Sequence, residues 1–142
     1  MVLRKWSFPS KKQCFSCHTD NENSNLGIEV NQALPEGISE SYLHSNCSGC
    51  HNPSTTTPSK IDFRYTTAFN DMNICDVAAE HEFNDEVGLK ILDPENKDNS
   101  AIYKRLNTVG DGQMPPLGRH QIDMKAVQVI GNWIDEIVSC DN

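Results

Sequence analysis

The stretch that decides the fold of this chain is a C-x-x-C-H run, Asn46-Cys47-Ser48-Gly49-Cys50-His51. On a helical backbone its two thiols lie about one turn apart, and the imidazole follows roughly 100° further round. Covalent attachment of a c-type haem requires this spacing, because each cysteine bonds one vinyl group and the histidine reaches the iron. The stretch therefore predicts a haem held by Cys47 and Cys50, with His51 as its proximal ligand.

A second copy of the motif lies near the N-terminus, at Cys14-Phe15-Ser16-Cys17-His18. By the same chemistry Cys14 and Cys17 would hold another haem, with His18 on its iron, so we expect two covalently attached haem c groups. Two cysteine pairs can also form a zinc ribbon. The 29 residues between the pairs exceed the usual 15–20, and zinc gives no reason for a histidine after each pair. Haem is therefore the preferred interpretation.

The other two cysteines, Cys75 and Cys140, form an even remainder. In an oxidising compartment such a remainder indicates a disulfide, and haem is attached to paired thiols outside the cytoplasm. We therefore expect a bridge, with two unpaired buried thiols as the alternative, in a periplasmic or otherwise exported protein. No signal peptide is visible in Met1–Trp6, so we expect that a leader was removed or that the chain is part of something longer.

Composition narrows the choice of partners. The 142 residues fit one domain, and the hydrophobic fraction of 37% with a mean hydropathy of −0.56 suits a chain whose core is completed by a prosthetic group. The net charge of −8 argues against nucleic acid and anionic membranes, which attract basic surfaces. It is compatible with redox protein partners that dock through a basic surface. No stretch approaches the roughly 20 apolar residues of a membrane span.

Three helices are predicted after the first motif. Ser39 is expected to cap a helix from about 40 to 50 that ends with the second motif, and Asn99 or Ser100 to cap a short helix. Asp123 is expected to cap the last helix, about 25 Å long, whose apolar residues recur at helical spacing on one face. These residues are Ala126, Val127, Ile130, Trp133, Ile134, Ile137 and Val138.

Two other segments carry expectations of a different kind. Ile61–Tyr65 alternates like a brief strand, although Phe63 and Tyr65 would equally suit the wall of a haem pocket. Gly110–Gly118 contains two prolines and three glycines, so it is predicted to be a stiff loop. That loop presents Met114, and a thioether opposite an imidazole completes a low-spin haem suited to electron transfer. Met114 is therefore the predicted distal ligand opposite His51.

The order of these features resembles class I c-type cytochromes, in which C-x-x-C-H, an M-P-P loop and a terminal aromatic-bearing helix follow one another. Tyr42–Pro53, Met114–Gly118, Asp123 and Trp133-Ile134 more narrowly resemble an uncharacterised bacterial family of exported haem-binding proteins with YLxxNCxxCH and MPPLG motifs. The segment with Cys14 and Cys17-His18 is similar to the upstream part of that family, which usually has a longer insert between the two motifs.

The resemblance implies a mainly α, class I cytochrome c-like fold around haem in residues 38–142. Residues 1–37 form an N-terminal extension that carries the other haem motif. The resemblance also implies a bridge from Cys75 to Cys140, between the middle loop and the end of the last helix. The distal ligand of the first haem stays open among His44, His81, His120, Met72 and Met124, with His44 preferred because it lies close in sequence to both motifs.

The expected function is electron transfer between redox partners by a non-enzymatic dihaem cytochrome or cytochrome domain. One alternative is a haem enzyme or sensor, similar to dihaem peroxidases, in which the first iron keeps an open position. Another is a monohaem cytochrome whose first motif holds no haem.

Overall fold

Helices are the regular elements of the computed structural model, which describes residues 10–12 and 38–141. The first C-x-x-C-H motif, with Cys14, Cys17 and His18, lies outside the described residues, as does most of the predicted extension. In the range 38–141 the α-helices are α2 (Ile38–Cys47), α3 (Ala101–Leu106) and α4 (Met124–Glu136). Two short 3₁₀ turns, η2 (Phe69–Asp71) and η3 (Lys97–Asn99), lie between α2 and α3, and isolated β-bridges take the place of a sheet in this part of the chain. The regular structure of the described residues is thus mainly helical, as predicted.

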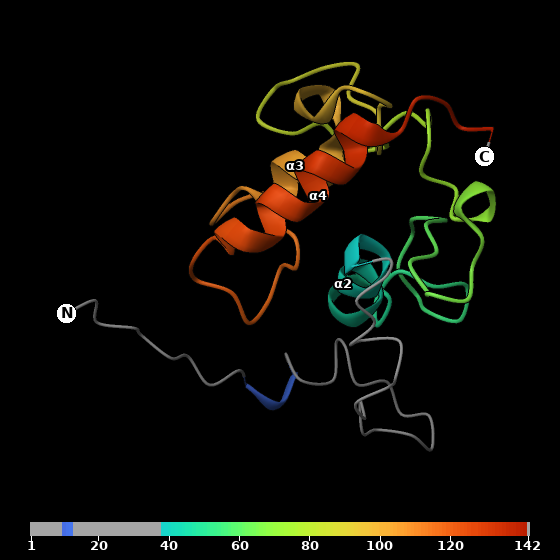
Figure 1. The fold of residues 1–142 in the computed structure, drawn as a ribbon. Coiled ribbons are helices and arrows are strands. Elements are labelled where there is room, and N and C mark those ends of the chain that lie inside the picture. The colour runs from blue at the N-terminus through green and yellow to red at the C-terminus, as the bar shows by residue number, and fades with distance from the viewer. Residues whose placement is uncertain (1–9, 13–37, 142) are drawn as a thin grey trace.

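Helix α4 is the centre of the arrangement, because both α2 and α3 pack against it (Figure 1). Its start is the predicted one: Oδ1 of Asp123 accepts hydrogen bonds from the backbone N–H groups of Lys125 and Ala126, both at 3.1 Å. Its core-facing residues are Ala126, Val127, Ile130, Gly131 and Ile134. No helix among the described residues is long and apolar enough to cross a membrane.

The predicted length of α4 is wrong at its C-terminal end. The helix has 13 residues, about 20 Å, and the backbone becomes extended at Ile137. Successive side chains of an extended chain point to opposite sides. Ile137 is accordingly buried, whereas Val138, which was expected on the apolar face, is 75% exposed.

Helices α3 and α4 approach each other closely at Gly131. A Cβ atom at this position would lie 2.9 Å from the Tyr103 ring, so a side chain there would push the two helices apart. Ser100 stands at the predicted start of α3, but its side chain does not cap the helix. Its hydroxyl instead accepts from the backbone N–H of Asp93 and donates to the carbonyl of Asn96. Ser100 therefore fixes the turn that enters α3.

Helix α2 begins earlier and ends earlier than predicted. It starts at Ile38, so Ser39 lies inside the first turn and is buried instead of acting as the cap. It ends at Cys47, and the motif continues as a turn in which the N–H groups of Cys50 and His51 donate to the carbonyl of Cys47. This turn presents Cys50 and His51 beyond the end of the helix.

The strand predicted at Ile61–Tyr65 is not formed. Asp62 is buried and its carboxylate accepts from the guanidinium of Arg64 and the hydroxyl of Thr67, which curls the chain into a turn. The N–H of Phe63 donates to the carbonyl of His51 at 3.0 Å. The segment is thus tied to the motif. Phe63 forms part of the wall of a cavity, as the alternative expected, whereas Tyr65 does not line it.

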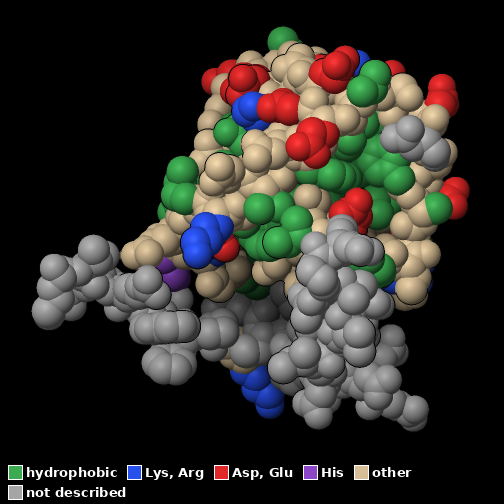
Figure 2. Space-filling model, viewed as in Figure 1, with side chains coloured by type: hydrophobic (Ala, Val, Ile, Leu, Met, Phe, Trp, Pro, Cys, Tyr) green, Lys and Arg blue, Asp and Glu red, His purple; other side chains and the backbone are tan. Residues whose placement is uncertain are grey.

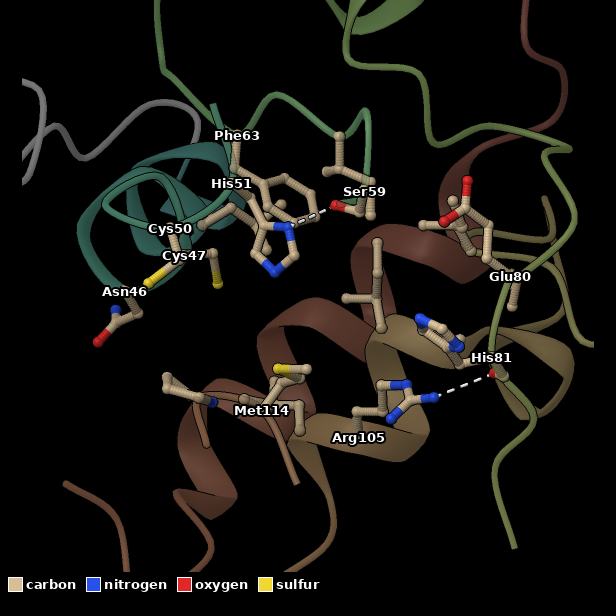
Figure 3. Close-up of a pocket in the computed structure, with 18 of the residues that line it drawn as sticks. Asn46, Cys47, Cys50, His51, Ser59, Phe63, Glu80, His81, Arg105 and Met114 are labelled. Carbon is tan, nitrogen blue, oxygen red and sulfur yellow. Dashed lines mark hydrogen bonds between the residues drawn. The ribbon is translucent and has the colours of Figure 1, made fainter. Parts of the chain in front are cut away.

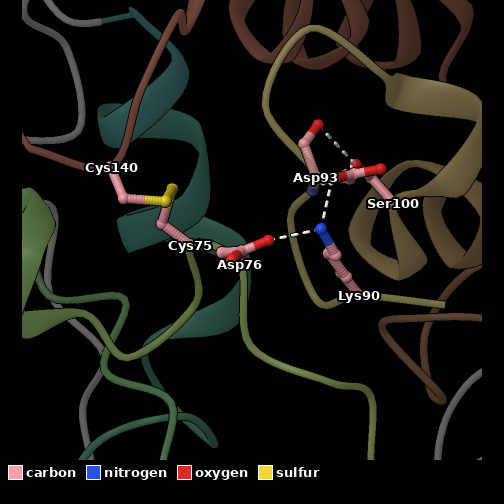
Figure 4. Close-up of a disulfide and its surroundings, with 6 residues drawn as sticks. All are labelled: Cys75, Asp76, Lys90, Asp93, Ser100 and Cys140. Carbon is pink, nitrogen blue, oxygen red and sulfur yellow. Dashed lines mark hydrogen bonds and ion pairs between the residues drawn. A yellow bond between two sulfur atoms is a disulfide. The ribbon is translucent and has the colours of Figure 1, made fainter. Parts of the chain in front are cut away.

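The middle of the chain is fastened to its end by a disulfide between Cys75 and Cys140, whose Cα atoms lie 5.7 Å apart (Figure 4). Beside it, Nζ of Lys90 contacts the carboxylates of Asp76 and Asp93. The core between these segments and the helices contains fully buried aliphatic side chains, namely Leu43, Ile74, Leu92, Ile130 and Ile134. The disulfide therefore links the irregular segment after η2 to the segment that follows α4.

Candidate functional site

A cavity of about 230 Å³ lies where the C-x-x-C-H turn, helix α3 and the Met114 loop meet (Figure 3). Its walls are mostly apolar. They include Leu43, Ile61, Phe63, Val77, Ala78, Ala79, Ile91, Ile102, Leu106, Pro115, Pro116 and Leu117. The segments that line it are separated by long stretches of sequence, so the fold itself creates the cavity.

The two thiols of the motif lie at one end of this cavity. Cys47 ends α2, Cys50 lies in the turn that follows, and neither forms a disulfide. Burial, with repulsion from Cys50 added, raises the pKa of the Cys47 thiol to about 12. Cys47 is therefore a protonated thiol at neutral pH.

His51 is held by two neighbours on the far side of the motif. Its Nδ1 lies 2.9 Å from Oγ of Ser59, and its ring meets the edge of Phe63 with 5.7 Å between centroids. Burial lowers its pKa, so the ring is neutral at neutral pH. When Nδ1–H donates to Ser59, Nε2 keeps a lone pair that is able to bind a metal. In metal sites a hydrogen bond of this kind from the other ring nitrogen orients the histidine.

Met114 lines the same cavity, 63 residues after His51 in the chain. Its loop is held from both sides: the N–H of Met114 donates to the carbonyl of Arg105, and Nε2 of Gln113 donates to the carbonyls of Pro115 and Arg119. The other two methionines of the described residues, Met72 and Met124, lie elsewhere. Met72 is 2% exposed in the core, Met124 is 65% exposed, and neither lines the cavity.

The residues around the cavity fit a covalently attached haem. A c-type haem is held by two reduced thiols three positions apart, a neutral imidazole and a thioether, and the cavity has all four. Its apolar wall suits the faces of a porphyrin. Sequence reasoning missed Ser59, because a serine eight residues beyond the motif in a Ser/Thr/Pro stretch carries no local signal.

His44, the preferred ligand for the first haem, lies on α2 and does not line the cavity. The N–H of Tyr65 donates to its Nδ1 at 3.2 Å, so a neutral ring carries its proton on Nε2. Binding of a metal through Nε2 would require this hydrogen bond to break. His81 lines the cavity and His120 does not, and both residues are exposed. Because His18 lies outside the described residues, the ligand pair of the first haem remains a prediction.

The alternative of a zinc site finds no further support in residues 10–12 and 38–141. In that part of the chain no three side chains of His, Cys, Asp or Glu gather to hold a metal ion. A ribbon would need Cys14 and Cys17, which lie outside the described residues.

Comparison with known proteins gives no match: no family model, no curated protein and no solved structure is similar to this chain. The likeness to class I cytochromes therefore rests on the motifs.

Proposed function

We propose that this chain is a c-type cytochrome that carries electrons between redox proteins outside the cytoplasm. In the proposal Cys47 and Cys50 hold one haem covalently, and His51 and Met114 are its axial ligands. The observation that carries the proposal is that Met114, far away in sequence, lines the same apolar cavity as the C-x-x-C-H turn. Of the methionines of the described residues, it alone combines that position with a stiff loop.

A haem held by the imidazole of His51 and the thioether of Met114 would supply an iron of raised potential, suited to electron transfer. The residues of the chain prepare this pair. Ser59 orients His51 through Nδ1, and burial keeps the ring neutral. The loop of Met114 is fixed by its backbone contact with Arg105 and by the side chain of Gln113. Groups that are held in place in this way need little rearrangement when charge changes.

The second copy of the motif extends the proposal to two haems. Cys14, Cys17 and His18 repeat the complete set of two thiols and an imidazole. Two haems in one small chain would lie close enough to exchange electrons and pass them to a partner. Figure 2 shows more acidic than basic side chains on the upper part of the face drawn, which suits a partner with a basic docking surface.

The test is to produce the chain in a host that attaches c-type haem and to measure its intact mass and visible spectrum. We expect the polypeptide mass plus two haem masses. The matched variants Cys14→Ser/Cys17→Ser and Cys47→Ser/Cys50→Ser should each lose one haem. One haem in the wild type would favour the monohaem alternative, and zinc without haem would overturn the proposal. Carbon monoxide binding to the reduced protein would favour an enzyme or sensor with an open iron.

A further inference from the structure

Arg105 lies on α3 at the end of the cavity away from the two thiols (Figure 3). Its guanidinium is immobilised on three sides. Nη1 donates to the carbonyl of Gly112 at 3.1 Å, and Nη2 donates to the carbonyls of His81 and Glu82 at 3.1 and 3.3 Å. The Phe83 ring centroid lies 5.5 Å from the guanidinium carbon. The cation is therefore held in one place by groups that carry no net charge.

The positive charge of Arg105 has no anionic partner among the described residues. The ion pairs of residues 38–141 are those of Arg64, Lys90, Lys97 and Lys104, and none includes Arg105. Arg105 is half-buried, and its contacts with the carbonyls of His81 and Glu82 lie at the surface, so an anion that enters the cavity can reach the guanidinium. A guanidinium has five N–H hydrogens, so its three carbonyl contacts leave donors for an anion. The arrangement suits a carboxylate that comes from outside the described chain.

We propose that Arg105 binds a carboxylate of the ligand that fills this cavity. The inference rests on the haem function proposed above, and it deepens that function. Haem carries its vinyl groups and its two propionates on different edges of the porphyrin. If the vinyl edge meets Cys47 and Cys50, an acidic edge faces away from the thiols, toward the end of the cavity where Arg105 lies. Arg105 would then be the group that pairs with one propionate and sets the direction in which the ring lies.

The pairing has a measurable consequence for the propionate. An opposite charge within about 4–6 Å lowers the pKa of a carboxyl group by roughly 1–3 units. The other ionisable side chains that line the cavity are Tyr42, Cys47, Cys50, His51, Lys60, Glu80 and His81. Lys60 is exposed, and Glu80 would act in the opposite sense, so the fixed guanidinium supplies the principal favourable charge. Because its planar fork is already held, little entropy is lost when it binds a carboxylate.

The experiment uses the full holoprotein with ¹³C placed selectively in the haem propionate carboxyls by growth on labelled aminolaevulinate. In the reduced, diamagnetic state the carboxyl signals are followed by NMR as the pH is changed. In the wild type we expect one propionate to titrate clearly below the ordinary carboxyl value of about 4.3. In Arg105→Gln its pKa should rise by about 1–3 units. Arg105→Lys should keep most of the depression.

The matched control is Lys104→Gln, which removes one positive charge from the same helix at a residue that pairs with Glu86 and does not line the cavity. It should leave every propionate titration in place. The inference is overturned if no wild-type propionate titrates low, which decides the matter even if Arg105→Gln fails to fold. It is also overturned if Gln and Lys shift the signal equally, because that would assign Arg105 to anchoring the loop. Absence of labelled haem would instead reject the proposed function.

Discussion

The backbone N–H of Met114 donates to the carbonyl oxygen of Arg105 over 3.1 Å, which fastens the thioether loop to the last turn of α3. The same oxygen accepts from Nη2 of Arg119 at 3.1 Å. Arg119 also donates to the carbonyls of Leu106 and Thr108. The last carbonyls of a helix lack intrahelical partners, and a cation there also meets the negative end of the helix dipole. One arginine thus closes α3 and anchors the loop that follows it.

Replacing Met114 with Ala should abolish the weak near-infrared sulfur-to-iron band and lower the potential of one haem. The loss of a thioether ligand is the cause, because a methionine opposite a histidine raises the potential. Optical spectra and a redox titration of both proteins provide the measurement. Met124→Ala is the matched control, since that side chain is exposed and does not line the cavity. A Met114→Ala protein with both haem signatures unchanged would show that the assignment is wrong.

Arg119→Gln should lower the free energy of unfolding by about 1.5–3 kcal/mol, because hydrogen bonds from a charged donor to the end of α3 are lost. It should also weaken the sulfur-to-iron band, since the loop of Met114 loses its anchor. Denaturant unfolding followed by circular dichroism measures the first effect, and the oxidised spectrum measures the second. Lys125→Gln removes a charge from an exposed position and should change neither. A band that survives in Arg119→Gln would mean that the loop holds its place without this side chain.

Asp62 makes the stability of the protein depend on pH. Hydrogen bonds from Arg64, and to a lesser extent from Thr67, hold the pKa of its carboxyl below the ordinary value. A carboxyl with a lowered folded pKa contributes stability above its unfolded pKa, and the contribution is lost as the pH falls through the folded pKa. Asp62→Asn should therefore lower the free energy of unfolding by about 1.5–3 kcal/mol at pH 7.

The difference between wild type and Asp62→Asn should shrink as the pH is taken below about 4, and unfolding curves at several pH values test this. Asp71→Asn at an exposed position provides the comparison. A constant difference from pH 7 to pH 3 would contradict the assignment of the effect to the Asp62 carboxylate.

Loss of the disulfide in the double variant Cys75→Ser/Cys140→Ser should markedly lower the free energy of unfolding. The bond spans 65 residues, for which the chain-entropy estimate is about 4 kcal/mol. Unfolding of the two proteins at equal haem content gives the difference. Neither cysteine lines the cavity, so haem content should stay the same. Alkylation without reductant provides a direct check: two alkylated cysteines in the wild type would mean that the bond is absent.

The parts of the fold that could be predicted are those with local signals. Asp123 starts α4 because its side chain bonds to N–H groups two and three residues on, and the apolar period continues directly after it. The prolines and glycines around Met114 likewise exclude helix and strand within a few residues. In such segments the sequence neighbours are also the structural neighbours.

The rest depends on contacts across long stretches of chain. The prediction of a strand at Ile61–Tyr65 was wrong because Arg64 and Thr67 turn back on Asp62. The N–H of Phe63 donates to the backbone carbonyl of His51 instead of to a neighbouring strand. Arg119 has no local pattern that marks it, since its acceptors lie 11 to 14 residues earlier. Arg105 is similarly recognisable only after the loop of His81 has folded against α3.

The bond between Cys75 and Cys140 also closes a covalent ring within the chain. The ring runs along the chain from Cys75 to Cys140, so its sequence includes α3, Met114 and α4. The haem-motif residues Cys47, Cys50 and His51 precede it. A protease that cuts at an exposed site within the ring, such as the segment around Val87, would leave a nicked but single molecule. Its pieces would separate on a denaturing gel only after reduction. Until then, the thioether loop remains tethered to the thiol turn at a high effective concentration.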